Sequence, residues 1–282
     1  MHDLLSIPVS IVNGNSGAAD KLAYLARGVF WAVSRRIGLS FIVRLWNGAR
    51  IKVFPNSSFS PMFYFKYPEG ADMQFFRANS SLANTFVDVG ANVGIFSALM
   101  ADKFSNVIMF EPSSDSFHSL EIMSGLNGQM AKFELHNIAV SDLPGSVKFI
   151  DEGAMSSGNR ITNDENFTGA GVVVVRADTL DNVLAGRFDK IVMKVDIEGG
   201  EERAFNGAYN LFANNCIRLV MFERLGRTNL QGIEKFLSTH KYKVFRVLDN
   251  GVLSVDHDEI SVPLINLFAC PENIFSQLNT EF

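Results

Sequence analysis

Apolar runs and helical segments alternate along the chain from about Asn84 onward. Uninterrupted apolar runs predict strands buried on both faces, and apolar residues three or four apart predict helices. Strands are expected at 85–89, 106–111, 132–141, 147–150, 171–177, 190–196, 217–223, 242–248 and 263–270. Helices are expected at 94–104, 114–127, 201–215 and 230–240. This alternation predicts a doubly wound, mostly parallel α/β sheet, with an antiparallel edge from the last two strands around an Asn-Gly turn at 250–251.

The first 80 residues follow a different pattern. Apolar residues at helical spacing predict a helix from Ala19 to Ile37, and the segment 41–54 predicts a β-hairpin that turns at Asn47-Gly48. The segment 56–71 is rich in Ser, Pro, Phe and Tyr and is expected to be an irregular cap or a short strand. We therefore expect an N-terminal extension over residues 1–80 and a main domain over residues 81–282.

Composition and charge narrow the class of protein. With 47% hydrophobic and 20% charged residues, the chain resembles an ordinary soluble enzyme, and its net charge of −5 argues against a nucleic-acid surface. Cys216 and Cys270 have no metal-ligand or disulfide spacing, so a reduced, cytoplasmic protein is expected. No apolar stretch is long enough for stable membrane insertion, and the basic pair Arg35-Arg36 is weak evidence for a membrane surface.

The stretch FVDVGANVGIFS, residues 86–97, predicts a cofactor site where the first strand of the main domain meets its helix. Gly90 and Gly94 permit a tight turn and the close approach of a ligand to the backbone. A dinucleotide fingerprint would place glycine where this chain has Asn92. The carboxylate of Asp88 would repel a pyrophosphate and attract the ammonium group of an amino acid. S-adenosyl-L-methionine is therefore favoured over NAD.

Further candidate cofactor contacts follow the next two strands. Glu111 ends the second strand, 23 residues after Asp88, where an acidic residue accepts hydrogen bonds from ribose hydroxyls. Asn137, Ile138 and Asp142 follow the third strand, where adenine would lie. A simple turn through Pro144-Gly145 explains these three residues equally well.

A second motif is the strand KIVMKVD followed by IEGGEE, residues 190–202. Lys194 in a buried strand needs a carboxylate partner or must lose its charge. The same strand ends in Asp196, at the sheet edge that also holds Gly90. We interpret both residues as candidate catalytic groups, although a structural salt bridge with Asp196 capping the next helix is the alternative.

The order of four blocks resembles the FkbM family of class I S-adenosylmethionine-dependent methyltransferases. The blocks are FVDVGANVGIFS, FEP, TLD at Thr179–Asp181, and KVDIEGGE, and the resemblance covers roughly residues 69–248. It implies a seven-stranded sheet of order 3-2-1-4-5-7-6 with strand 7 antiparallel. It also implies O-methylation of a hydroxyl on a sugar, glycan or natural product. By this resemblance, Asp88, Gly90, Asn92 and Gly94 hold the methionine part, Glu111 holds the ribose, and Asp196 lies beside the methyl group and the acceptor.

The acceptor hydroxyl must lose a proton, and two routes are open. Asp196 or Lys194 can take the proton as a base. Alternatively, a divalent cation bound by Asp196, Glu198 and Glu223 can lower the pKa of the acceptor hydroxyl. Glu223 ends the next strand and can reach the same cleft. We favour the side-chain route because the sequence has no diagnostic metal motif.

Three other functions compete with the methyltransferase interpretation. They are a nucleotide-cofactor oxidoreductase, a non-enzymatic binding protein on the same fold, and a nucleic-acid methyltransferase.

Two segments are candidate lids over the site. They are the loop 153–171 and the aromatic run 58–70, with Phe59, Phe63, Tyr64, Phe65 and Tyr67. The sequence leaves open the acceptor, any metal requirement and the oligomeric state.

Overall fold

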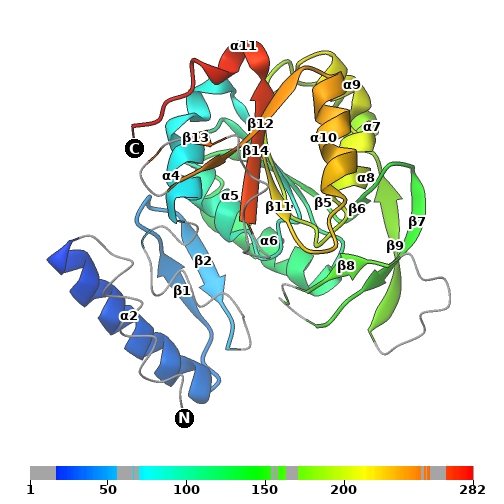
Figure 1. Cartoon of the computed structure of the whole chain (residues 1–282). Coiled ribbons are helices and arrows are strands. Elements are labelled where there is room, and N and C mark those ends of the chain that lie inside the picture. Colours follow the sequence, from blue (N-terminus) through cyan, green and yellow to red (C-terminus); the bar gives the residue numbers. More distant parts are fainter. Residues whose placement is uncertain are drawn as a thin grey trace.

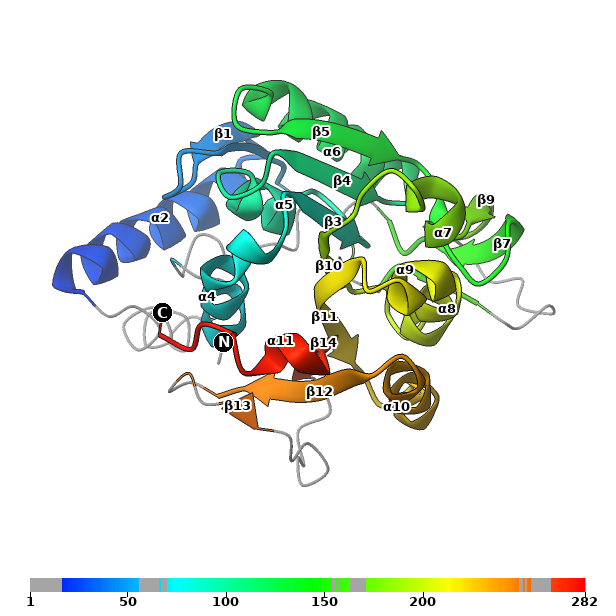
Figure 2. The ribbon, with the colours of Figure 1, turned by 90° about the horizontal axis from the view of Figure 1, so that it is seen from above.

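The computed structural model describes residues 17–55, 66, 70–153, 156, 158–162, 171–248, 251, 253–254 and 265–281. A large central sheet has helices on both faces, and the N-terminal helix lies at the outer edge of the molecule (Figures 1 and 2). The aromatic run at 58–65 and Tyr67, most of the loop 153–171, and Asn250 of the expected turn lie outside the described residues.

The central sheet has eight strands in the order β13-β12-β14-β11-β10-β3-β4-β5. Its strands are β3 (Thr85–Val89), β4 (Asn106–Phe110), β5 (Lys132–His136), β10 (Ile191–Val195), β11 (Ile217–Arg224), β12 (Tyr242–Val247), β13 (Leu253–Ser254) and β14 (Ile265–Pro271). Neighbouring strands from β5 to β11 pair in parallel, whereas β14 is antiparallel to both β11 and β12. The expected order is confirmed, and β13 is an additional edge strand. The antiparallel strand β14 lies between β11 and β12, not at the edge.

Helices cover each face of this sheet and bury separate clusters of apolar side chains. One face carries α4 (Gly70–Ala78), α5 (Ile95–Met100), α6 (Ser114–Asn127) and α11 (Glu272–Phe275), with the short 3-10 turn η1 (Ser80–Leu82). The other carries α7 (Leu180–Leu184), α8 (Glu201–Asn206), α9 (Tyr209–Ala213) and α10 (Leu230–Thr239). Strand residues alternate between the faces, so Phe86 enters the first cluster and Val87 the second. The doubly wound architecture is therefore confirmed.

A smaller sheet stands beside the carboxyl ends of the central strands. It has the order β6-β9-β7-β8 and consists of β6 (Ala139–Val140), β7 (Gly145–Ile150), β8 (Arg160–Ile161) and β9 (Val172–Asp178). The expected strand at 132–141 is therefore wrong in its extent. Its first half is β5 of the central sheet, while Ala139 pairs with Ala177 of β9. The two sheets share this continuous stretch of chain, which brings the small sheet to the central sheet's edge.

The N-terminal extension contains the predicted helix, α2 (Ala18–Arg36), and hairpin, β1 (Phe41–Arg44) and β2 (Arg50–Val53). The hairpin turns at Gly48, whose φ of +92° suits glycine. Asn127 of α6 accepts a hydrogen bond of 2.7 Å from the Arg50 N–H, and its amide donates one of 2.6 Å to the Arg50 carbonyl oxygen. These bonds dock the hairpin against the main domain. The boundary between residues 80 and 81 stays a prediction.

The expected helix at 201–215 is wrong, because the chain forms two short helices, α8 and α9. They are separated at Gly207, where an added Cβ would overlap the carbonyl oxygen of Ser141. The Asp181 carboxylate then accepts hydrogen bonds from the Asn210 and Leu211 N–H groups at 2.8 and 3.1 Å. These bonds cap the first turn of α9. The helix expected at 94–104 ends earlier, at Met100, and α4 was not expected.

Candidate active site

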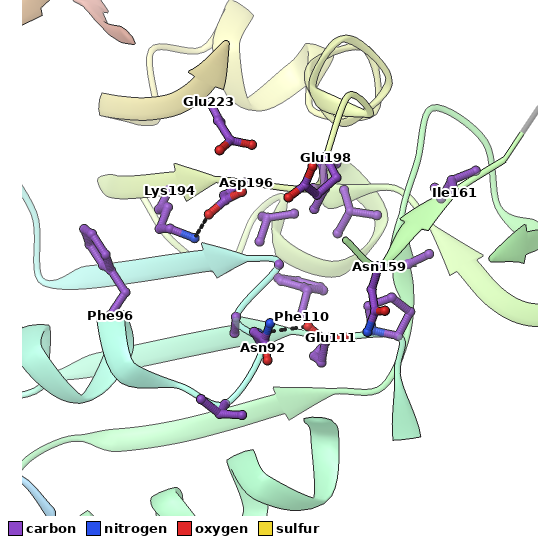
Figure 3. A pocket seen from close by; sticks show the side chains of 18 of the residues that line it. Asn92, Phe96, Phe110, Glu111, Asn159, Ile161, Lys194, Asp196, Glu198 and Glu223 are labelled. Carbon is purple, nitrogen blue, oxygen red and sulfur yellow. Dashed lines mark hydrogen bonds and ion pairs between the residues drawn. The ribbon is translucent and has the colours of Figure 1, made fainter. Parts of the chain in front are cut away.

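A cavity of about 260 Å³ lies at the carboxyl ends of β3, β4 and β10, beside the small sheet. Figure 3 shows two groups of polar side chains around it: Lys194, Asp196, Glu198 and Glu223 in one part, and Asn92, Glu111 and Asn159 in another. The volume lies just below the range of about 300–1,000 Å³ for ligand pockets. Carboxyl ends of parallel strands are where doubly wound sheets bind ligands. We therefore treat this cavity as the candidate active site.

Contacts within the protein leave no room for a side chain at either glycine of the first motif. Gly90 has φ +80°, and an added Cβ would overlap the carbonyl oxygen of Asp196. Gly94 has φ +81°, and an added Cβ would come within 2.8 Å of Leu120 and 2.7 Å of Met123 on α6. Gly90 lines the cavity and Gly94 does not. Glycine at position 90 therefore lets the ends of β3 and β10 approach each other at the cavity.

Glu111 is held rigidly at the end of β4. Its two carboxylate oxygens accept hydrogen bonds of 2.9 Å from the N–H groups of Asn92 and Ser113. The side chain is buried, and this burial raises the pKa of Glu111 to about 7 against the backbone hydrogen bonds. Glu111 lines the cavity, and each of its oxygens keeps a second lone pair for a ligand hydroxyl.

Asn92 connects this turn to the small sheet's loop. Its φ is +49°, a conformation that asparagine tolerates better than most residues. Its amide donates a hydrogen bond of 3.0 Å to the carbonyl oxygen of Ser156, which also lines the cavity. Asn159 lies nearby, and its amide nitrogen is buried without a hydrogen-bond partner among the described residues. This unpartnered donor was not expected from the sequence and is available to a bound molecule.

Asp88 lies behind the cavity and does not line it. It is fully buried, and its Oδ2 accepts a 2.6 Å hydrogen bond from the Ser97 hydroxyl. Burial raises the pKa of the Asp88 carboxyl, and Lys194 and Ser97 act in the opposite direction. The predicted contact between Asp88 and the cofactor's ammonium group stays a prediction.

Lys194 connects Asp88 to the cavity. Its Nζ is 3.6 Å from Asp88 Oδ1 and 3.0 Å from Asp196 Oδ2. It also lies 5.6 Å from the centre of the Phe96 ring, at cation–π distance. Lys194 is nearly buried, whereas the Asp196 side chain is 40% exposed. The lysine thus holds the carboxylate at the position that a bound molecule can reach.

Three carboxyl groups meet at the wall formed by β10 and β11. Asp196, Glu198 and Glu223 each offer an oxygen within 4.8 Å of the other two, a spacing that a cation site would also use. Burial and the nearby Asp196 carboxylate raise the pKa of Glu223 to about 9. Burial also raises the pKa of Glu198, which forms an ion pair with Arg227. Glu223 therefore carries a proton at neutral pH.

A fourth acid, Glu201, fixes the loop after β10. It is fully buried, and its Oε1 accepts a 2.9 Å hydrogen bond from the Gly199 N–H. Burial raises the pKa of the Glu201 carboxyl. The Thr228 hydroxyl donates to its other oxygen at 3.3 Å. Glu201 therefore positions the loop that presents Asp196 and Glu198.

The expected adenine contacts fall in different places. Ile138 lines the cavity, together with Phe110 and Phe149, which the sequence did not single out. The Asn137 amide donates to the Glu111 carbonyl oxygen at 2.8 Å and does not line the cavity. Asp142 is exposed, outside the cavity lining, and accepts a hydrogen bond from Ser141. Phe149 comes from the small sheet, so that sheet supplies part of the apolar wall.

The family comparison decides what kind of protein this is. The family model described as the methyltransferase FkbM domain matches residues 88–244, more than half of the chain. The chain belongs to the FkbM methyltransferase family. It is therefore a methyltransferase by family, and its central sheet has the strand order that the sequence predicts for the class I, Rossmann-like type. The TLD block of this FkbM domain has a local role, because Thr179 caps α7 and Asp181 caps α9.

Solved structures similar to this FkbM domain protein are distant in sequence. The ribosomal protein L11 methylase from Lactobacillus delbrueckii subsp. bulgaricus is 15% identical, with a TM-score of 0.39 over 71% of this chain and 76% of that chain. The tRNA (uracil-54, C5)-methyltransferase of Pyrococcus abyssi, in complex with S-adenosyl-L-homocysteine, is 16% identical, with a TM-score of 0.42 over 82% and 43%. An S-adenosylmethionine-dependent methyltransferase from Clostridium acetobutylicum ATCC 824 is 10% identical, with a TM-score of 0.38 over 73% and 92%. No curated protein sequence matches the chain significantly.

None of the helices in the described part of the chain combines the length and the apolar content that are needed to cross a membrane.

Proposed function

We propose that the chain transfers a methyl group to a hydroxyl of a sugar, glycan or natural product. One observation supports this most directly. A partly exposed carboxylate, Asp196, lines the cavity and is held 3.0 Å from the Lys194 ammonium. A fixed carboxylate at the methyl-transfer site is suited to take the proton of an alcohol, which is a poor nucleophile while protonated.

The charges around the cavity suit the proposed cofactor. Glu111, Asp196 and Glu198 are acidic, and Lys194 is the only basic residue among those that line the cavity in the described part of the chain. S-adenosyl-L-methionine carries a positive sulfonium and a positive ammonium group, whereas the pyrophosphate of NAD is negative. Carboxylates attract the former and repel the latter. The same charges also disfavour the oxidoreductase alternative.

The shape of the cavity fits the parts of this cofactor. The two ribose hydroxyls can donate to Glu111, whose orientation is fixed by two backbone N–H groups. The flat apolar adenine fits between Phe110, Ile138 and Phe149. Bound in this way, S-adenosyl-L-methionine supplies an electrophilic methyl group on a sulfonium, and transfer leaves a neutral thioether.

Two of the three candidate catalytic residues are unsuited to take the acceptor proton. Glu223 already holds a proton at neutral pH, because its pKa is about 9. The Lys194 ammonium is already paired with Asp88 at 3.6 Å and with Asp196 at 3.0 Å. Neither residue is then a base. Asp196 is left as the acceptor of the hydroxyl proton, while Lys194 and Glu223 position it.

The proposed transfer breaks two bonds and forms two. The acceptor O–H bond breaks, and its proton passes to an Asp196 oxygen. The acceptor oxygen forms the new bond to the methyl carbon in line with the breaking sulfur–carbon bond. Protonated Asp196 then releases its proton to solvent through its exposed side.

The test is a product assay with tritiated S-adenosyl-L-methionine and three acceptor panels: sugars and glycans, hydroxylated natural products, and total RNA. We expect label in one of the first two panels, and nuclear magnetic resonance to locate it on oxygen. Label on nitrogen, on carbon or in RNA would contradict the proposal. Cofactor binding without transfer to any panel would instead support the alternative of a binding protein on this fold.

A further inference from the structure

The outward face of α2 is apolar. Leu22, Val29, Val33 and Ile37 expose between 52% and 72% of their surface, and we call these four residues the α2 patch. Phe30, beside them, is half exposed and packs edge-on against Phe41 of the hairpin. Spacings of four and seven residues place the patch along one side of the helix. Apolar side chains gathered on one exposed helix face are unusual for a soluble protein. The α2 patch therefore needs an explanation outside the core.

The inward face of α2 already packs against the hairpin. The exposed face is therefore not the face through which the helix contacts the rest of the protein. Tyr24 and Trp31 are buried at 5% and 1% exposure. Trp31 packs edge-on against Phe41 of β1, and the Arg27 guanidinium donates a 2.9 Å hydrogen bond to the Arg44 carbonyl oxygen. Figures 1 and 2 both show α2 at the edge of the molecule, on the outer side of the hairpin. The helix thus presents two apolar faces, of which the hairpin covers one.

The charge around the patch is opposite to that of the whole chain. Residues 17–55 contain seven Lys and Arg but one acidic residue, Asp20, whereas the complete chain has a net charge of −5. Asp20 forms an ion pair of 3.3 Å with Lys66, which offsets its charge. Arg35 and Arg36, in the last turn of α2, are exposed. Arg36, three residues after Val33, therefore stands beside the apolar face at the end of the helix.

We propose that α2 seats the enzyme on an anionic lipid bilayer, with the α2 patch in the boundary between headgroups and acyl chains. An amphipathic helix with large apolar residues and flanking arginines binds bilayers in this way. Each arginine near the surface adds attraction to anionic lipids. The helix lies along the surface, in agreement with the absence of a bilayer-crossing helix among the described residues.

Charge favours a lipid surface over a second copy of the chain as the occupant. Two copies that met through the α2 patch would bring two basic regions together, and these would repel each other. An anionic bilayer attracts the same region while it covers the apolar side chains. Both contributions act together only on the membrane.

The test is sucrose-gradient flotation of the full chain with two kinds of vesicle. One kind mixes phosphatidylglycerol with phosphatidylcholine, and the other contains phosphatidylcholine alone. We expect the wild type to float with the anionic vesicles and to be released by high salt. Arg35→Gln/Arg36→Gln should lower the partition coefficient at least about tenfold. Val29→Glu/Val33→Glu should abolish flotation.

The matched control is Val174→Glu on β9, because Val174 is 71% exposed and far from α2 in the sequence. This variant should float like the wild type. Circular dichroism and cofactor titration check that each variant is folded. Three results would overturn the proposal. They are a wild type that does not float, flotation retained by Val29→Glu/Val33→Glu, and a dimer in light scattering that these substitutions dissociate. The dimer would assign the patch to a second copy.

Discussion

Lys194 and Asp88 stand opposite each other in the register of the two central strands, β10 and β3, with Nζ and Oδ1 3.6 Å apart. The same ammonium group is 3.0 Å from Asp196 at the cavity. A pair of opposite charges inside the sheet therefore fixes the group that orients the proposed base. The contacts of Lys194 connect the stability of the fold to the chemistry of the site.

Removal of Lys194 should therefore affect stability as well as activity. Lys194→Met leaves the fully buried Asp88 without its cation, and we expect the free energy of unfolding to fall by about 3 kcal/mol. The measurement is urea unfolding. Asp88→Asn/Lys194→Met removes both charges and should lose less than the sum of the single variants. Additive losses would show that the two residues are not coupled.

Asp196→Asn should lower kcat at least about 100-fold, because the amide cannot take the acceptor proton. The affinity for S-adenosylhomocysteine, which has no sulfonium charge, should change little. Glu223→Gln is the matched control. It mimics a carboxyl that is already protonated and should retain kcat within about tenfold of the wild type.

The same assay tests the cation route. If Asp196 takes the proton directly, a chelator leaves kcat unchanged. Loss of activity with the chelator, restored by a divalent cation, would instead assign Asp196, Glu198 and Glu223 as metal ligands.

Glu223 should also make stability depend on pH. Its pKa is about 9 in the folded protein and near 4.5 in an exposed carboxyl, so the folded state holds a proton that the unfolded state has released. This contribution is complete below about pH 4.5 and is lost as pH rises towards 9, by at most about 1.4 kcal/mol per pH unit. Glu223→Gln should gain stability relative to wild type as pH rises, measured by urea unfolding. Glu272→Gln, at an exposed carboxyl, should follow the wild type.

Two glycines should respond in opposite ways to alanine. Gly90→Ala places a Cβ on the Asp196 carbonyl oxygen at a φ of +80°, and we expect a loss of about 3 kcal/mol or no folded protein. Gly125→Ala lies in α6 with no atom within 4 Å of the new Cβ and should gain about 0.5–1 kcal/mol. Thermal unfolding compares them. Equal effects would contradict the close approach of β3 and β10 at Gly90.

The sequence predicts the core of the fold because its strands are continuous apolar runs. The strand from Thr85 to Val89 and that from Ile191 to Val195 are recognisable without the structure, and both end at the cavity. The sheet order came from the family resemblance. Local features were harder to predict, because they depend on contacts between distant residues. At the break at Gly207, for example, the Gly207 carbonyl oxygen accepts a hydrogen bond of 2.8 Å from the distant Asp181 N–H.

The site was partly predictable for the same reason. Glu111 and Asp196 follow strand ends, and strand ends can be found from the sequence. The depth of a residue within the sheet cannot be found in this way. The sequence therefore did not indicate that Asp88 lies behind the cavity, beneath Lys194. Phe149 and Asn159 belong to the small sheet and its loop, and only the folded chain brings them beside Glu111.

The most direct test of this account is calorimetric titration of the dialysed protein with S-adenosyl-L-methionine, S-adenosylhomocysteine and NAD. We predict that the two adenosyl compounds bind and NAD does not. We also predict that Glu111→Ala, which removes the proposed ribose contact, abolishes binding while the protein stays folded. Binding of NAD alone, or equal affinity of wild type and Glu111→Ala for S-adenosyl-L-methionine, would contradict the account of this cavity.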